Sequence, residues 1–223
     1  MASGRTSTTV RIISGSLRGR RLKAPAGSRV RPTSDSLRET LFNVLGPSVA
    51  GARVLDAFAG TGALGLEAIS RGAAHATFVE TDPAALRVLR ENVAAFGVEN
   101  ACVIIRGDFP IALRRHSARD GRGRLDRERP GDMSPILDER ARAYDLILLD
   151  PPYATVDLVA VVEDAAAFMA APARVVLEHS RRRTSPEVAG RLRRTRVLAA
   201  GDSALSFYEP DPVVARDRHT EGA

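Results

Sequence analysis

The sequence predicts an α/β protein, with a mostly parallel seven-stranded sheet, helices on both faces and a C-terminal antiparallel hairpin. Two observations predict this fold class. From residue 53 to residue 191, short apolar runs bounded by turn residues alternate with segments of helical periodicity. Such alternation gives parallel strands joined by helices that pack on the sheet. After residue 193, two strand-like runs flank Gly201 and Asp202, which is typical of a hairpin.

The elements can be assigned in order along the chain. Residues 10–23 alternate around a Ser-Gly-Ser turn and predict a β-hairpin. A helix with Thr33 or Ser34 as its N-cap follows and ends at Gly46. Strand and helix signals then alternate: strand 53–56, helix 63–71, strand 75–80, helix 83–96, strand 102–106, helix 109–115, strand 145–149, helix 155–170, strand 173–179 and helix 185–191. Strands at 194–200 and 203–209 complete the sheet.

The chain has the length of one domain with appendages. We place the domain at 47–210 and the hairpin and helix of residues 10–46 before it as an extension. Residues 116–142 are rich in Arg, Asp, Gly and Pro and poor in apolar side chains, so we expect a disordered insertion there. Flexible tails are expected at 1–9 and 211–223.

A glycine-rich segment joins the first strand of the alternating region to its first helix. Gly60, Gly62 and Gly65 match G-x-G-x-x-G between a strand and a helix, the context that this cofactor-binding motif needs. Glycine lets the backbone approach a ligand, and the helix N-terminus presents N–H groups to it. Glu80 ends the second strand, where an acid can accept hydrogen bonds from ribose hydroxyls. The pattern predicts an adenosine-containing cofactor at the carboxyl ends of the strands.

Three details favour S-adenosylmethionine over NAD(H), the cofactor of the alternative oxidoreductase reading. Asp56 precedes the loop, where a carboxylate can pair with an ammonium group but would repel a pyrophosphate. The loop contains no Lys or Arg, and Asp108 after the third strand can accept from an adenine amino group. The residues expected to bind S-adenosylmethionine, and its product S-adenosylhomocysteine, are Asp56, Ala57, Phe58, Gly60, Thr61, Gly62, Glu80, Thr81, Asp108 and Phe109.

The apolar run 146–149 ends at Asp150, Pro151, Pro152 and Tyr153, which we take as the catalytic residues. Prolines fix φ and carry no N–H, so this turn is stiff and its carbonyls can only accept hydrogen bonds. An exocyclic amine is a donor, and a carboxylate and a carbonyl can hold it while the tyrosine ring stacks on the base. The motif therefore predicts a pocket for a flat heterocycle that presents an amino group.

The motifs at 56–62 and 150–153 resemble those of the class I amino-methyltransferases, which have a Rossmann-like fold. Four N-terminal stretches narrow the resemblance to the RsmD family: 11–15, 18–22, 31–33 and 38–43. The resemblance covers about residues 10–209 and implies a methyltransferase domain at 47–210. It also implies S-adenosylmethionine-dependent methylation of a guanine N2 in 16S rRNA, on a small ribosomal subunit that is assembled or in late assembly.

The residues themselves leave the target base open, because the motif does not separate adenine N6, cytosine N4, guanine N2 and glutamine side chains. An adenine-N6 methyltransferase acting on RNA or DNA is therefore one alternative. A DNA enzyme normally needs a separate target-recognition domain, and no segment of this chain is left for one. A non-catalytic RNA-binding assembly factor is the alternative from another class.

The net charge of +6 favours a polyanionic partner, and one group of basic residues lies in the N-terminal segment, where no acid precedes Asp35. Guanidinium groups bind phosphates in pairs of hydrogen bonds and stack on bases. A solvated basic arm is the alternative. Arg38 lies off the apolar stripe of its helix, free to meet substrate or solvent. The residues expected to contact RNA are Arg11, Arg18, Arg20, Arg21, Arg31, Thr33 and Arg38.

Features that the sequence lacks exclude several kinds of protein. The single cysteine, Cys102, lies beside an apolar run and is expected in the core. The histidines show no metal-ligand spacing, so no metal is expected, and a structural role is favoured for His179. No apolar run has the length of a membrane helix, and the N-terminus lacks the apolar segment of a secretion signal. We expect a cytoplasmic monomer.

Overall fold

The computed structural model describes residues 10–25, 33–120, 143–152 and 157–212. The predicted tail at 1–9, most of the predicted tail at 211–223 and residues 121–142 of the predicted insertion lie outside these residues.

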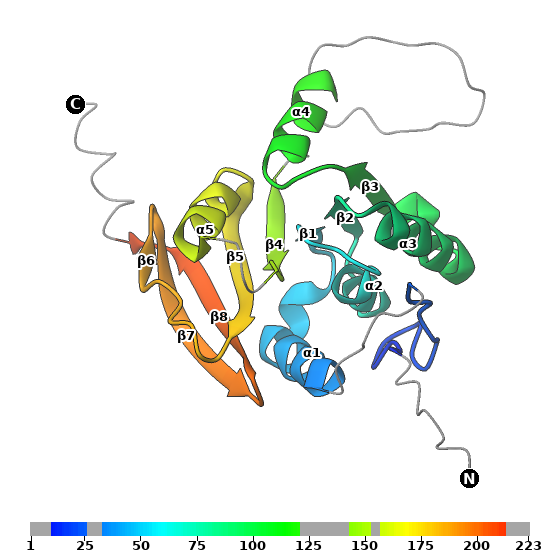
Figure 1. Cartoon of the computed structure of the whole chain (residues 1–223), viewed down its shortest axis with the longest axis horizontal. Coiled ribbons are helices and arrows are strands. Elements are labelled where there is room, and N and C mark those ends of the chain that lie inside the picture. Colours follow the sequence, from blue (N-terminus) through cyan, green and yellow to red (C-terminus); the bar gives the residue numbers. More distant parts are fainter. Residues whose placement is uncertain (1–9, 26–32, 121–142, 153–156, 213–223) are drawn as a thin grey trace.

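The described residues form one eight-stranded sheet in the order β3-β2-β1-β4-β5-β8-β7-β6 (Figure 1). Its strands are β1 (Arg53–Asp56), β2 (His75–Glu80), β3 (Cys102–Arg106), β4 (Tyr144–Leu149), β5 (Met169–Ser180), β6 (Val188–Ala189), β7 (Leu192–Ala200) and β8 (Ser203–Pro210). The first five pair in parallel and the last three continue the sheet in antiparallel fashion. The predicted α/β fold with its C-terminal hairpin is confirmed, and the two-residue β6 adds an eighth strand.

Helices cover both faces of the sheet because its strands are apolar on both sides (Figure 1). Side chains alternate along each strand: Val54 packs toward α1 (Thr33–Leu45), α2 (Ala63–Ser70) and α3 (Pro83–Phe96). The next residue, Leu55, packs toward α4 (Ile111–Asp120) and α5 (Leu158–Ala166). Two short 3₁₀ turns, Gly46–Val49 and Glu99–Ala101, precede β1 and β3.

The α3 helix shows how local sequence fixes an element. Asp82 is its N-cap and accepts from Ala85 N at 2.7 Å, and Pro83 occupies the first turn. Gly97 ends the helix in the left-handed conformation, with φ of 69°. The predicted bounds of this helix are confirmed, and its apolar stripe of Leu86, Leu89, Val93 and Phe96 is buried.

Three predicted helices differ from the structure. The helix at 185–191 is wrong: Pro186 cannot donate a backbone hydrogen bond, and Gly190, with φ of 56°, turns the chain so that β6 pairs with β7. The helix predicted at 155–170 is the shorter α5, because β5 already begins at Met169. The helix predicted at 109–115 is α4, which continues to Asp120 because no Gly or Pro interrupts it. The insertion predicted from residue 116 therefore begins inside this helix.

Residues 10–25, which we call the arm, fold back on themselves with a single bridge between Arg11 and Arg21. Ile12 N donates to Arg20 O and Leu22 N to Val10 O, both at 2.9 Å. Ile12 and Leu22 are buried and anchor the arm on the core next to α1, α2 and α3. The predicted hairpin is thus present as two antiparallel legs, but without regular strands in the arm.

Among the described residues, no helix combines the length and the apolar character needed to cross a membrane.

Candidate functional site

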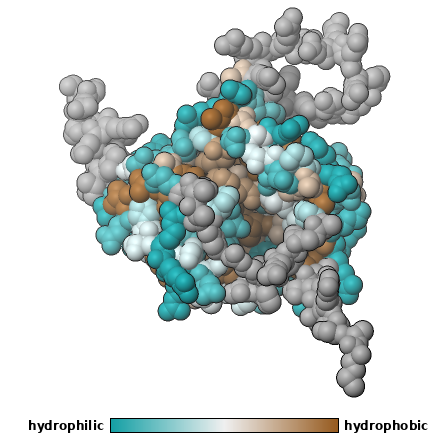
Figure 2. Space-filling view, in the orientation of Figure 1, coloured by the Kyte–Doolittle hydropathy of each residue, from teal (hydrophilic) through white to brown (hydrophobic). Residues whose placement is uncertain are grey.

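The strand order reverses between β1 and β4, and in open α/β sheets ligands bind outside the carboxyl ends of the strands at such a switch point. Asp56 ends β1, and Asp150 follows β4 directly. The first residue after β1 continues the pairing with β4, because Ala57 N donates to Leu148 O at 3.0 Å. Because β1 and β4 are neighbours in the sheet, the glycine loop and the Asp-Pro-Pro turn lie side by side. Figure 2 shows apolar side chains near the middle of the molecular face, with hydrophilic ones around them.

The glycine loop is held in a tight turn. Gly60 and Gly62 have φ of 53° and 83°, a region that side chains with a Cβ rarely adopt. Gly62 N donates to Ala59 O at 2.7 Å, and Ala59 N donates to Val79 O of β2 at 3.0 Å. Gly62 is also the N-cap residue of α2, so the loop leads into the N–H groups of a helix N-terminus.

The third glycine of the motif lets α2 approach the sheet closely. A Cβ on Gly65 would lie 2.3 Å from the ring of Phe78 in β2, which is a severe overlap. Gly65 N also donates to Asp56 Oδ2 at 3.0 Å. Gly65 thus sets both the packing of α2 and the position of the carboxyl group that precedes the loop.

Asp56 lies beneath the glycine loop and is 1% exposed. Burial raises the pKa of Asp56 to about 7, against the lowering effect of the Gly65 N–H. The nearby Glu80 carboxylate raises this pKa further. The structure thus makes Asp56 a support of the loop, and its predicted pairing with an ammonium group stays a prediction.

Glu80 ties the end of β2 to the glycine loop. Its Oε2 accepts from Gly60 N at 2.6 Å, and its Oε1 accepts from Thr81 N and Asp82 N at 2.7 and 2.8 Å. A carboxylate has about four acceptor positions, so Glu80 can still accept from a ribose hydroxyl. Its place beside Gly60 agrees with the predicted cofactor contact.

The turn that carries Asp108 joins the same edge. Gly107 N donates to Glu80 O at 2.9 Å, which sets the turn beside the end of β2. Asp108 is exposed, and the next ring, Phe109, meets Phe58 of the glycine loop edge to face, with 5.9 Å between centroids. The residues predicted to bind the cofactor are therefore brought together from three neighbouring turns.

The predicted catalytic motif follows β4 at this edge. Asp150 is half-buried, Pro151 is buried and Pro152 is exposed. Tyr153, the predicted stacking ring, lies outside the described residues. The structure thus sets the acidic group and the first proline beside the glycine loop.

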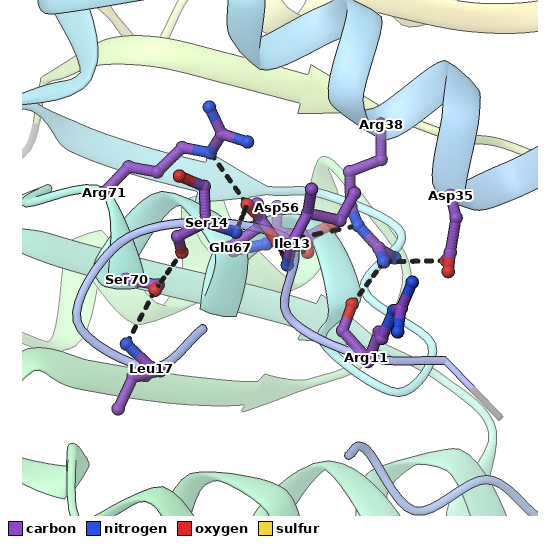
Figure 3. Close-up of polar contacts among 11 residues, drawn as sticks. Arg11, Ile13, Ser14, Leu17, Asp35, Arg38, Asp56, Glu67, Ser70 and Arg71 are labelled. Carbon is purple, nitrogen blue, oxygen red and sulfur yellow. Dashed lines mark hydrogen bonds and ion pairs between the residues drawn. The ribbon is translucent and has the colours of Figure 1, made fainter. Parts of the chain in front are cut away.

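Arg38 overturns one prediction for the RNA surface. Its side chain is 4% exposed, and it donates to Arg11 O at 2.6 Å and to Asp35 Oδ1 at 2.9 Å (Figure 3). Its Nε lies 3.8 Å from Glu67 Oε2 and has no hydrogen-bond partner in the part of the chain that the structure describes. Burial lowers the pKa of Arg38, and Asp35 and Glu67 oppose that effect. Arg38 holds the arm to the core and is not free to meet RNA.

Glu67 is the fully buried acid that receives the arm (Figure 3). Ile13 N donates to its Oε2 at 2.7 Å and Ser14 N to its Oε1 at 3.0 Å. Arg71 Nε donates to the same Oε1 at 2.7 Å. One turn along α2, Ser70 Oγ accepts from Leu17 N at 2.9 Å. The arm is therefore fixed to the helix that follows the glycine loop.

The arginines of the arm divide into two groups. Arg20 donates to the carbonyls of Ala95 and Phe96, and its guanidinium lies 4.7 Å from the centre of the Phe96 ring. A cation at a helix C-terminus is stabilised by the helix dipole, so the guanidinium of Arg20 has a structural role that the RNA prediction did not include. Arg11, Arg18 and Arg21 are exposed. Arg31 and the side chain of Thr33 lie outside what the structure describes.

Sequence reasoning missed two arginines at the same edge of the sheet. Arg181 and Arg182 follow β5 directly and are exposed. Because β5 pairs in parallel with β4, these residues flank the Asp-Pro-Pro turn on the side away from the glycine loop. The signal that could have found them is the run of three arginines at residues 181–183, directly after a predicted strand.

His179 and Cys102 are structural, as the sequence predicted. His179 is 4% exposed, and its Nε2 lies 2.9 Å from Ser206 Oγ, across the pair of β5 with β8. Cys102 packs against the core on the α1–α3 side, and burial raises the pKa of its thiol to about 12. The thiol of Cys102 is half-buried and stays protonated near neutral pH, and the His179 ring is held by its hydrogen bonds.

Comparison with known proteins identifies the relatives of this chain. A family model described as conserved hypothetical protein 95 matches residues 10–123 and 129–209. The chain is 35% identical over 202 residues to "Putative rRNA methyltransferase YlbH" of Bacillus subtilis, which covers 90% of this chain and 98% of that protein. It is 51% identical over 98 residues to "Ribosomal RNA small subunit methyltransferase D" of Escherichia coli, a match of 44% of this chain and 50% of that relative. The solved structure "Putative methyltransferase yhhF from Escherichia coli" matches with a TM-score of 0.70 at 31% identity, over 91% of this chain and 98% of that one.

Proposed function

Because the chain belongs to the RsmD/YlbH family of class I S-adenosylmethionine-dependent methyltransferases, we propose that it methylates the exocyclic N2 of one guanine in 16S rRNA. The cofactor is S-adenosylmethionine, and the coarser activity is that of an rRNA methyltransferase. The guanine target and the small ribosomal subunit, assembled or in late assembly, are the finer parts of the proposal. An rRNA substrate also assigns the protein to the cytoplasm.

The observation that carries the proposal is the shared edge of the two turns. The glycine loop follows β1 and the Asp-Pro-Pro turn follows the neighbouring β4, and Ala57 N at the start of the loop donates to Leu148 O of β4. Methyl transfer needs its donor and acceptor atoms in line and close together, and this arrangement supports the proposal that the two ligands have adjoining sites. S-adenosylmethionine supplies an electrophilic methyl group on a sulfonium when it is bound there.

The residues after β4 suit an aromatic amine as the acceptor. The lone pair of such an amine is delocalised into the ring, so the nitrogen is a poor nucleophile until it becomes more tetrahedral. Asp150 and the Pro151 carbonyl would each accept a hydrogen bond from one N–H group of the amine. These hydrogen bonds would favour the tetrahedral geometry and stabilise the positive charge that develops on nitrogen. One N–H proton then leaves the nitrogen, which restores its neutral form. Tyr153 is expected to stack on the base.

The charged residues suit an RNA substrate. Arg11 and Arg21 are exposed on the arm, and Arg181 and Arg182 are exposed beside the catalytic turn. We assign the second pair to phosphates next to the target base, because phosphate contacts orient a nucleic acid on a protein without reading its sequence. A monomer can present both pairs.

One experiment tests the proposal. Labelled S-adenosylmethionine is offered with small subunits that lack the modification, with free rRNA or with duplex DNA, and the labelled nucleosides are separated. The expected product is N2-methylguanosine from the small subunit. Asp150→Ala should lower the rate on the order of 10²–10³-fold while leaving the binding of S-adenosylhomocysteine unchanged. Label on N6-methyladenosine would replace the guanine assignment, and binding without label would support an assembly factor.

A further inference from the structure

Asn92 joins the arm to the glycine loop through one buried side-chain amide. It lies on α3 and is 1% exposed. Its Oδ1 accepts from Lys23 N at 2.8 Å. Its Nδ2 donates to Lys23 O at 3.1 Å and to Thr61 O at 3.0 Å. A single side chain therefore uses an acceptor and two donors to connect two segments that are far apart in sequence.

The two segments belong to the two binding surfaces of the protein. Thr61 lies between Gly60 and Gly62, whose positive φ angles form the turn of the glycine loop. Lys23 lies on the leg of the arm that carries Arg21. Asn92 therefore connects the Thr61 carbonyl to the backbone of the arm through hydrogen bonds alone.

We propose that Asn92 is a positioning residue that couples cofactor binding at the glycine loop to the order of the arm, and through the arm to RNA binding. The link to RNA rests on the proposed function. Coupling of this kind is reciprocal, so a cofactor that orders the arm favours RNA binding, and bound RNA favours the cofactor by the same factor.

The chemistry of Asn92 makes the proposal specific. In Asn92→Asp, one carboxyl oxygen can still accept from Lys23 N, but the other would lie about 3 Å from the carbonyl oxygens of Lys23 and Thr61 and would repel both. Asn92→Ser offers a single donor, which can serve only one of the two carbonyls. Each variant weakens the connection between the arm and the loop at a side chain that is not itself among the residues expected to bind the cofactor.

Glu91 provides a matched control on the same helix. Its Oε2 lies 2.8 Å from Lys23 Nζ, and the two side chains are 43% and 62% exposed. Glu91→Gln removes this surface contact with the same arm residue and leaves the Asn92 amide in place. It should leave the coupling unchanged.

The test is hydrogen exchange of the arm amides, above all those of Ile12, Leu22 and Lys23, with and without saturating S-adenosylhomocysteine. In the wild type and Glu91→Gln, the ligand should slow exchange by about 5-fold or more, the lower end of common coupling factors. In Asn92→Asp and Asn92→Ser, the slowing should fall below about 2-fold although the ligand is still bound. A purely structural role would speed exchange equally with and without ligand and leave the slowing intact, and that result would overturn the proposal. No slowing in the wild type would also overturn it.

RNA methylation then separates the two proposals. No RNA is present in the exchange experiment, so its outcome does not depend on the substrate. With small subunits, Asn92→Asp should raise the KM for subunits by about 5-fold more than Glu91→Gln does. If the wild type methylates no RNA, the proposed function fails while the coupling measured by exchange stands.

Discussion

Glu67→Gln should destabilise the protein more than most single substitutions do. Glu67 is fully buried and accepts from Ile13 N, Ser14 N and Arg71 Nε at 2.7 to 3.0 Å. In glutamine an NH2 group replaces one of the two carboxylate oxygens, so a donor faces another donor. The substitution also removes the negative charge beside Arg38 and Arg71. Breaking a buried ion pair costs about 3–5 kcal/mol, because one charge stays buried without its partner.

That loss converts to a decrease in Tm of roughly 6–20 °C for a chain of this length. Thermal and urea unfolding followed by circular dichroism measure it, and Glu91→Gln, which breaks an exposed pair, should leave the Tm within experimental scatter. Arg38→Met combined with Glu67→Gln should cost less than the sum of the single changes, because the two groups interact. A loss below about 1 kcal/mol for Glu67→Gln would show that the carboxylate is not buried against the arm.

Three further predictions follow from the site. The raised pKa of Asp56 means that its carboxyl group keeps a proton in the native state over a pH range in which the unfolded chain releases it. The contribution of Asp56 to the free energy of unfolding is therefore complete below about pH 4 and is lost as the pH rises to about 7. Urea unfolding at pH 5 and pH 7 should show that the free energy of unfolding of the wild type falls by up to about 1.4 kcal/mol per pH unit. The Asp56→Asn variant should not show this fall. Gly65→Ala should cost about 1–3 kcal/mol by overpacking and weaken S-adenosylhomocysteine binding in calorimetry, whereas Gly97→Ala, which has positive φ but no atom within 4 Å of the new Cβ, should spare binding. Arg181→Ala and Arg182→Ala should each reduce the salt dependence of RNA affinity by about one unit of slope in filter binding; an unchanged slope would remove these residues from the RNA surface.

Strands 53–56, 75–80 and 102–106 were predicted with the bounds that the structure has. Each is a short apolar run between a helix signal and a turn signal, and each pairs in parallel with its neighbour although β3 lies at the edge of the sheet. In such strands the local pattern and the tertiary packing favour the same conformation. The glycine loop was assigned for the same reason, because its backbone conformation depends on glycines that are visible in the sequence.

The errors arose where partners distant in sequence decide the outcome. Arg38 lies off the apolar stripe of α1 and so was predicted to be free, but Glu67 and the arm bury it from outside the helix. Residues 185–191 were assigned to a helix because strand and helix signals had alternated up to that point. The antiparallel pairing with β7 decides this segment, and helical periodicity contains no information about that partner. Asn92 could not be identified from the sequence, since its three bonds connect residues 31 and 69 positions away.

The strand order explains how one crevice can serve both a small cofactor and a large RNA. The glycine loop follows β1, the Asp-Pro-Pro turn follows β4, and Arg181 follows β5, so the catalytic turn lies between the cofactor loop and the exposed arginines. A base that enters the turn would then have the methyl donor on one side and its own phosphates on the other. Phosphates on the β5 side would stay clear of the Glu80 carboxylate, which would repel them. The acid that suits a ribose of the cofactor would thus also direct the proposed RNA backbone to the opposite side of Asp150.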